Sequence, residues 1–476
     1  MPSLRVSAPV GLLDLDALRA ELEVPGPFSP GALAEARAAA AAPRLPELNR
    51  TDLPMLTIDP PGSRDLDQAL HLERAGDGFV VWYAIADVAA FVTPGGVLDT
   101  ELSSRGVTLY APDARVPLHP PVLGEDAASL LPDQVRPALL WRLDLDASGE
   151  LTTTGVRRAL VRSRSRLDYA GVQSALDDGT AGPVLELLRV IGGLRQALAR
   201  ERDAVDLPTP EQEVELDAQG RPSLVLRAQL PCEAWNAQIS LLTGMAAAGL
   251  MLRGGLGLLR TLPPADPEAV TALRRSVLAL GVDWPEGTAY GDVVSGLDPT
   301  VPAHAALLTL ATRLLRGAGY TAFDGEPPAQ PLHSAVAAPY AHCTAPLRGL
   351  ADRHVGEVCL AVSAGTPVPP WARSALPGLP EVMTAATRRA NALERAVVDA
   401  AEAVVLQARI GERFPAVVVD SGAAGGMVQL LEPPVRVRCD GADLPLGETV
   451  EVEVIEADPV ARQVRTRRVQ PGPAQV

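Results

Sequence analysis

The sequence predicts an α+β protein: a large mixed α/β domain, a small β-barrel after it and a short helical segment before it. Three observations lead to this fold class. Strand-like runs alternate with helical patterns between residues 50 and about 400, five short β-rich runs follow Gly411, and the first 48 residues contain only short helical patterns. We therefore expect units at 1–48, 49–408 and 409–476. A chain of 476 residues that is 47% hydrophobic can bury cores of this size.

The first unit contains two predicted helices. Residues 14–22 have a helical apolar spacing, and the Ala-rich residues 31–42 form a strong helix-forming stretch. A helix-turn-helix-like unit and an arm that packs on the rest of the chain are both compatible with this pattern.

The large domain is predicted to combine a buried strand, several helices and irregular connections. Residues 79–88 form an unbroken apolar run typical of a buried strand. Asp217 to Gly220 resembles the tip of a hairpin, and the Pro-rich stretch 365–380 is expected to be a loop. Helical patterns occupy residues 184–200, 270–280, 303–315 and 384–408.

The C-terminal unit is predicted to be an OB-type barrel. Its five β-rich runs cover residues 414–420, 426–431, 435–439, 449–455 and 463–469. Small barrels of this kind commonly bind single-stranded nucleic acid. Arg465 and Arg467 on the last run are therefore candidate nucleic-acid contacts.

Composition restricts the possible partners. A net charge of −16 argues against a protein coated in basic charge, although a locally basic channel is compatible with it. All 42 basic residues are Arg, whose planar fork matches phosphate oxygens. The four cysteines form no CxxC pair, and no stretch is apolar enough to be expected to cross a membrane. We expect a cytoplasmic monomer with buried free thiols and no membrane association; protein partners stay unknown.

An acidic turn at residues 57–70, TIDPPGSRDLDQAL, is the most informative feature of the sequence. Asp59 precedes a stiff Pro-Pro-Gly reversal. If the following residues are extended, Asp65 and Asp67 project from the same side of a strand. Three carboxylates held close together need a compensating cation, and their oxygens suit Mg²⁺ or Mn²⁺. A solvated loop or a helix cap remains the alternative, whereas the spacing does not fit an EF-hand.

Several motifs in a fixed order resemble those of one enzyme family. The acidic turn is followed by RGVTLYAPD at 105–113, RLDY at 166–169, CEAWNAQIS at 232–240, YAHCTAPLRGLAD at 340–352 and NALER at 391–395. Together they resemble the ribonuclease II (RNB) family, and the match covers about residues 50–400. The terminal barrel stands where that family carries its RNA-binding barrel, so the large unit is expected to be an RNB-type catalytic domain.

The resemblance implies a metal-dependent, processive 3′-to-5′ exoribonuclease that converts single-stranded RNA to 5′-mononucleotides. It implies that one or two Mg²⁺ or Mn²⁺ ions are held by Asp59, Asp65, Asp67 and Gln68, and two such ions can activate water and stabilise the departing oxygen. It makes Arg348 the group that contacts the scissile phosphate. Glu394 is a further candidate catalytic residue, for which an ordinary ion pair is the alternative.

Other matched residues are candidate RNA contacts. Tyr110 and Tyr169 are expected to stack on bases near the 3′ end, unless they are core residues. The alternating Arg162, Arg164 and Arg166 would line one face of a strand and follow the phosphates. Glu233 matches the family's acidic helix and completes the predicted RNA-binding set, whereas His342 is expected to be structural.

The sequence also departs from the family pattern. Gln68 replaces the fourth acid of the run, so cation binding should weaken and Mn²⁺ is expected to be preferred. Gly349 and Leu350 replace an Arg and a Tyr after Arg348, and Leu207 replaces a stacking aromatic of some relatives. These departures keep an alternative open, namely a catalytically weakened relative that binds RNA without degrading it.

Overall fold

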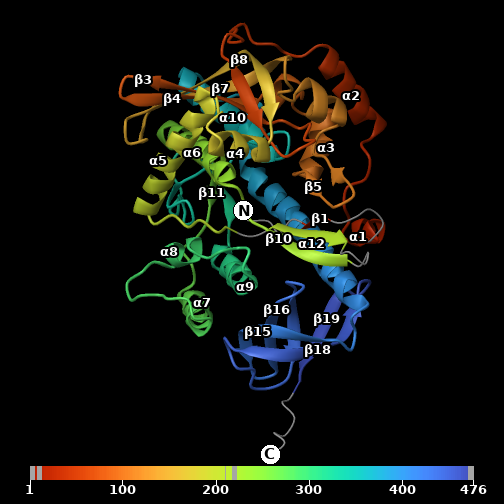
Figure 1. The fold of residues 1–476 in the computed structure, drawn as a ribbon. Helices are drawn as coiled ribbons and strands as arrows, with labels where there is room; N and C mark the ends of the chain where they lie inside the picture. Colours follow the sequence, from red (N-terminus) through yellow and green to blue (C-terminus); the bar gives the residue numbers. More distant parts are fainter. Residues whose placement is uncertain (1–5, 8–12, 209–210, 217–221, 470–476) are drawn as a thin grey trace, which may run out of the picture.

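The computed structural model describes residues 6–7, 13–208, 211–216 and 222–469. Within these ranges the chain forms a large mixed α/β unit and a smaller β-barrel, joined by one long helix (Figure 1). The expected α+β fold class is confirmed. The predicted hairpin tip at Asp217 to Gly220 lies outside the described residues.

A closed five-stranded barrel forms the centre of the large unit. Its neighbours follow the order β2-β3-β4-β7-β8; β2 runs parallel to β8 and every other pairing within it is antiparallel. Tyr83 and Trp141 are fully buried within its core, and the predicted buried strand corresponds to β4. The strands are β2 (Met55–Ile58), β3 (Gln68–Ala75), β4 (Gly78–Ala86), β7 (Val135–Leu145) and β8 (Leu151–Leu167).

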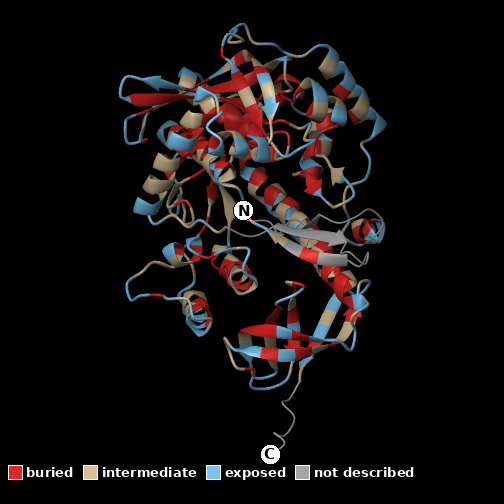
Figure 2. Ribbon diagram, viewed as in Figure 1, coloured by how far each residue is buried: buried red, intermediate tan, exposed pale blue. Residues whose placement is uncertain are grey.

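Helices pack against this barrel and against one another. The helix α6 contacts both α5 and α10, and a large part of its surface is buried (Figure 2). Gly192 of α5 lets α6 approach closely, because a Cβ there would lie 2.4 Å from the Cβ of Trp235. The helices of this layer are α3 (Val97–Arg105), α4 (Tyr169–Asp177), α5 (Pro183–Glu201), α6 (Pro231–Gly254) and α10 (Leu350–Ala364).

Short strand pairs connect these layers. The pair β11-β12 is antiparallel, and β12 contacts the long helix α12. Among the described residues the short strands are β1 (Val6–Ser7), β5 (Leu109–Tyr110), β6 (Arg115–Val116), β9 (Glu211–Leu216), β10 (Pro222–Arg227), β11 (Leu256–Thr261), β12 (Gly319–Asp324), β13 (Leu332–His333) and β14 (Ala338–Pro339).

A small helical cluster lies between the large unit and the terminal barrel. It buries Trp284 and packs against Val417 and Val419 of the barrel strand β15. Its elements are α7 (Pro267–Ala279), α8 (Tyr290–Ser295), α9 (Pro302–Ala311) and the 3-10 turn Thr312–Leu315. The helices expected at 270–280 and 303–315 are therefore present.

The expected loop at 365–380 is wrong. A short helix, α11 (Pro370–Ala375), and a 3-10 turn (Leu376–Gly378) lead directly into α12 (Leu379–Gln407). The prolines do not prevent this, because Pro370 opens α11 and Pro380 lies in the first turn of α12, where a backbone N–H has no helical partner.

The terminal unit is a closed barrel, as predicted. The strand order is β15-β16-β17-β19-β18, with β17 parallel to β19. Apolar side chains that alternate along the strands fill it, together with Ala401, Val405 and Leu406 from the end of α12. Its strands are β15 (Arg413–Gly422), β16 (Gly425–Leu430), β17 (Arg436–Asp440), β18 (Thr449–Asp458) and β19 (Gln463–Arg468).

The two N-terminal helices pack on different parts of the chain. Leu15 and Leu18 of α1 (Leu15–Glu21) lie against Leu393 and Val397 of α12. Ala32 and Ala36 of α2 (Pro30–Ala41) join the core of the large unit. Each helix therefore covers a surface of the larger unit.

Two further expectations concern the cysteines and membrane-spanning helices. All four cysteines are buried free thiols, as expected. Among the described helices, none combines the length and the apolar character needed to cross a membrane.

Candidate active site

The acidic turn connects β2 to β3 and carries its carboxylates before β3 begins. β2 ends at Ile58 and β3 starts at Gln68, so Asp65 and Asp67 are not strand residues. The expectation that they share one face of a strand is therefore wrong. The reversal is made by Pro60 to Gly62, where the positive φ of 80° suits glycine.

Asp67 is buried and held by two donors. Its side chain accepts a 2.7 Å hydrogen bond from the backbone N–H of Leu347 and a 2.6 Å hydrogen bond from Nε of Arg348. Burial raises the pKa of Asp67, and both donors oppose that rise because they stabilise the ionised form. The arrangement brings together two residues that are 281 positions apart.

The loop that carries Arg348 is fixed from several sides. The Asp352 carboxylate accepts 2.8 Å bonds from the backbone N–H of Ala345 and from Nδ1 of His342. The side-chain amide of Gln68 donates to the carbonyl of Thr344. On the other side, Nδ1 of His119 lies 3.1 Å from the carbonyl oxygen of Leu347. These contacts restrain the backbone at Thr344, Ala345 and Leu347, one to four positions before Arg348.

Arg348 is a partly exposed cation whose terminal nitrogens make no hydrogen bond within the described residues. Burial lowers its pKa, but neighbouring Asp67 more than compensates, so the net shift is upward and the group stays cationic. Its side chain keeps 34% of its surface exposed. The bond to Asp67 uses Nε alone, so the two terminal nitrogens can serve an anionic ligand.

Asp59 lies in a different electrostatic setting from Asp67. Burial raises its pKa to about 6, the negative charge of Asp65 adds to that rise, and Arg348 and Arg166 oppose it. Tyr169 lies close enough for Asp59 to contribute to its raised pKa of about 12, after burial as the main cause. The Tyr169 hydroxyl accepts a 3.3 Å bond from Asn236. Asp59, Arg348 and Tyr169 therefore share one electrostatic neighbourhood.

The predicted four-ligand metal set is not assembled as expected. Among the described residues, no three His, Cys, Asp or Glu side chains form a group suited to a metal ion. Asp67 is engaged by Leu347 and Arg348, and Asp65 is paired with Arg115. Asp59 fits a cation best, because no hydrogen bond to its side chain occurs in the described part of the chain and burial beside Asp65 disfavours its bare charge.

The other predicted RNA contacts occupy varied positions. Tyr110 is 45% exposed and lies close enough to Arg348 to raise the pKa of the Arg348 guanidinium. Arg162, Arg164 and Arg166 lie on one side of β8, next to buried neighbours on the other. Arg164 donates to the carbonyl of Thr51 and Arg166 to that of Ser63. Arg166 therefore also braces the backbone of the acidic turn, whereas Arg164 holds the segment before β2.

The remaining predicted residues lie elsewhere. Glu233 caps the start of α6, where it accepts a 3.0 Å bond from the Leu230 N–H. Glu394 is half-buried on α12, and its catalytic role stays a prediction. Arg465 forms ion pairs with Asp440 and Glu456, and Arg467 lies 3.4 Å from Glu453. RNA phosphates would have to compete with these carboxylates for Arg465 and Arg467.

Sequence reasoning missed several residues of the site. Arg115 pairs with both Asp65 and Glu125, and it lies just beyond the matched motif at 105–113. The Leu347 N–H is a backbone donor, for which side-chain motifs give no signal. Asn236 lies within the matched stretch 232–240, so its spacing after Glu233 could have identified it.

Comparisons with known proteins identify the family of this chain. Residues 49–362 match the family model described as RNB domain, and residues 412–469 match RNase II-type exonuclease C-terminal S1 domain. The chain is 31% identical over 328 residues to "Exosome complex exonuclease RRP44 homolog A" of Arabidopsis thaliana, covering 65% of this chain and 35% of that protein. It is 26% identical over 408 residues to Ribonuclease R of Vibrio cholerae, covering 80% and 49%. The chain thus spans a third to a half of the length of these relatives.

Solved structures show the same fold. Mycoplasma genitalium RNase R in complex with ribose methylated single-stranded RNA superposes with a TM-score of 0.82 at 18% identity, over 96% of this chain and 78% of that chain. Yeast Ssd1, described as a pseudonuclease, superposes with a TM-score of 0.66 at 18% identity, over 92% and 53%. One architecture therefore occurs in an RNA complex and in a pseudonuclease.

Proposed function

This chain belongs to the RNB family, and from that premise we propose that it is a metal-dependent, processive 3′-to-5′ exoribonuclease that hydrolyses single-stranded RNA to 5′-mononucleotides. The buried contact between Asp67 and Arg348 carries the proposal. It holds a cation at a fixed place beside the acidic turn, with two terminal nitrogens left for a phosphate. Fixed positive charge of this kind stabilises the transition state of phosphodiester cleavage.

Each residue of the site has a distinct proposed role. Arg348 binds the scissile phosphate and stabilises the charge that develops on its oxygens. Asp67 is a positioning residue, since it fixes Nε of Arg348 and aligns the guanidinium plane. Tyr169 would contact the terminal nucleotide, a role that its proximity to Asp59 supports.

The proposed metal site centres on Asp59. Asp65 and the carbonyl oxygen of Gln68 are the further donors that could hold Mg²⁺ or Mn²⁺. A divalent ion bound there would supply an activated water and neutralise phosphoryl charge. Without an ion, Arg348 and Arg166 are the cations that offset the Asp59 charge.

One specific observation favours the alternative of an RNA-binding protein without nuclease activity. Gln68 brings no charge and uses its amide to hold the Thr344 carbonyl, so the acidic turn has three carboxylates, two of which are paired with arginines. In this alternative, the same arginines bind RNA phosphates and no hydrolysis follows.

A 5′-labelled single-stranded RNA separates the two functions. The protein is incubated with the RNA and Mg²⁺ or Mn²⁺, beside the Asp67→Asn variant. We expect a ladder that shortens from the 3′ end and is lost in the variant. RNA that stays intact with both ions, yet shifts on a native gel, would establish the binding protein instead.

A further inference from the structure

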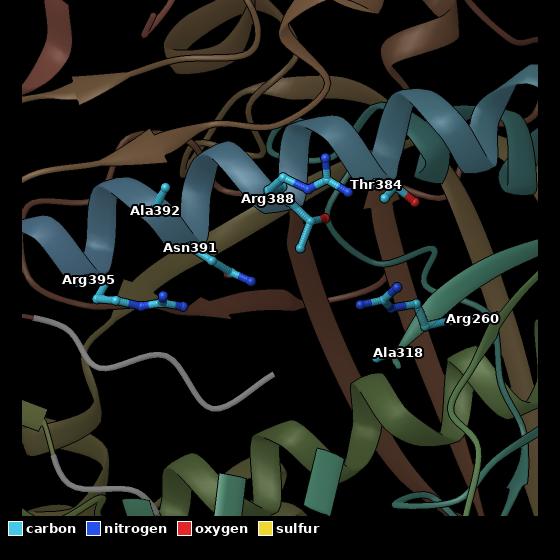
Figure 3. A pocket seen from close by; sticks show the side chains of 8 residues that line it. Arg260, Ala318, Thr384, Arg388, Asn391, Ala392 and Arg395 are labelled. Atoms are coloured by element: carbon cyan, nitrogen blue, oxygen red, sulfur yellow. The ribbon is translucent and has the colours of Figure 1, made fainter. Parts of the chain in front are cut away.

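A pocket on one side of α12 gathers arginines that the proposed chemistry does not use. It has a volume of about 350 Å³ and is lined by Arg260, Ala318, Thr384, Thr387, Arg388, Asn391, Ala392 and Arg395. Figure 3 shows the side chains of Arg260, Asn391 and Arg395 directed into the space beside the helix. Three of its eight lining residues are cationic and none is acidic.

The positive charge of this pocket is only partly offset by neighbouring carboxylates, because Asp399 interacts electrostatically with Arg395. Within the described ranges, Arg260, Arg388 and Arg395 form no ion pair, although the chain contains 58 acidic and 42 basic residues. Arg260 is only 9% exposed and stacks on Tyr320, with its guanidinium carbon 4.6 Å from the ring centroid. A buried cation without a carboxylate partner is costly, so Arg260 favours an anionic ligand, and the exposed Arg388 and Arg395 extend the same positive charge along α12.

The shape of the cluster matches a chain of phosphates better than one small anion. Thr384, Arg388, Asn391 and Arg395 recur at helical spacing and therefore lie along one face of α12. Arg388 and Arg395 are seven residues apart, which corresponds to roughly 10 Å along a helix. This spacing lets the two guanidinium groups serve successive phosphates of a nucleic-acid strand.

The pocket is connected to the candidate active site. The backbone N–H of Arg260 donates a 2.8 Å bond to the carbonyl of Tyr340. Arg348 follows Tyr340 by eight residues, a stretch that can span at most about 29 Å. The same loop therefore joins the pocket to the Asp67–Arg348 contact, within reach of a single RNA strand.

We propose that Arg260, Arg388 and Arg395 bind the backbone phosphates of an RNA strand upstream of its 3′ end, on the approach to the Asp67–Arg348 site. This inference rests on the proposed function for the identity of the strand. Thr387 and Asn391 supply neutral donors along the same face. The contacts are independent of base sequence, because only the phosphates are read.

The test measures RNA binding in the Asp67→Asn background, so that the RNA stays intact. Arg388→Ala/Arg395→Ala is compared with Arg142→Ala/Arg189→Ala, which removes two exposed arginines on β7 and α5. Binding of a 20-nucleotide RNA is followed from low to high salt. The slope of log K against log salt is negative, and each single-strand phosphate contact contributes about 0.7 to its magnitude. Loss of the two contacts made by Arg388 and Arg395 should therefore reduce that magnitude by about 1.4. The control should keep the original slope.

Three further arms complete the test. Arg388→Lys/Arg395→Lys should restore the slope, which separates lost charge from lost folding. The binding deficit of the Ala variant should grow as the RNA is lengthened from 4 to 20 nucleotides. An unchanged slope, or an equal deficit at every length, would overturn the proposal. Saturable binding of a free 5′-mononucleotide in the pocket, with no dependence on RNA length, would also overturn it and assign the pocket to a free anion.

The test also separates this inference from the proposed nuclease activity. Salt-dependent binding is measured without cleavage, so a protein that never degrades RNA can still show the pocket contact. Conversely, if the wild type degrades RNA but the pocket variant and the control variant bind with equal slopes, only the proposed pocket contact is refuted.

Discussion

Two substitutions of Asp67, to Ala and to Asn, should separate the contribution of its carboxylate to stability from its contribution to activity. Asp67→Ala deletes the acceptor of two bonds, one from the buried N–H of Leu347 and one from Arg348. An unsatisfied buried N–H costs about 1–3 kcal/mol, and a charge-assisted bond contributes about 1.5–3 kcal/mol. The Arg348 side chain is 34% exposed and water can partly replace the lost partner. We therefore expect a loss of roughly 3 kcal/mol, near the lower end for a broken buried ion pair.

Asp67→Asn provides the matched comparison. An amide can still accept from the Leu347 N–H, so the stability loss should fall to about half that of the Ala variant. Activity should fall by at least roughly 100-fold in both variants, because Arg348 loses its fixed orientation in both. Thermal unfolding and the initial rate of 3′ shortening measure the two effects. An Asn variant that cleaves within threefold of wild type would refute the positioning role of Asp67.

Three further predictions follow from the same geometry. Burial raises the pKa of Asp59 to about 6, so the metal-free folded state binds this proton more tightly than the unfolded state. The contribution of Asp59 to stability should therefore fall as the pH rises from about 4 to 6, and thermal melts of the metal-free protein and of Asp59→Asn at pH 4 and 8 would detect this; equal pH dependence in both would contradict it. Asp352→Ala should destabilise the protein by roughly 2 kcal/mol and lower the rate, because the bonds to His342 and the Ala345 N–H disappear; urea unfolding with unchanged stability would contradict this. Rates with Mn²⁺ should exceed those with Mg²⁺ at matched low concentration, and Gln68→Asp should reduce that preference; equal rates in the wild type would dismiss the role assigned to Gln68.

Much of the fold could be predicted because its signals are local. The apolar run at β4 and the five β-rich runs of the terminal barrel lie close to where the structure has them. The exception at 365–380 has a local reason as well: prolines were read as helix breakers, whereas Pro370 and Pro380 occupy first turns. Closure of β2 beside β8 could not be predicted from pattern alone, because it depends on pairing across more than 100 residues.

The site was only partly predictable, because motifs identify residues and not their partners. The ordered motifs correctly associated the acidic turn with the loop around Arg348, which the structure places in contact. They could not show that Asp67 would be used by protein donors or that Asp65 would pair with Arg115. The strand argument failed because the residues after the Pro-Pro-Gly reversal stay irregular until Gln68.

Gln68 does something that a fourth acid could not do. Its amide donates to the Thr344 carbonyl, and an Asp or Glu at this position would place negative charge against that oxygen. The substitution therefore exchanges one unit of charge in the acidic turn for a direct link to the loop that carries Arg348. Asp67, Asp352 and His119 hold the same loop at Leu347 and Ala345. A protein that only binds RNA gains little from so tightly fixed a cation, whereas phosphodiester cleavage depends on one, so this bracing of Arg348 supports the nuclease over the binding protein.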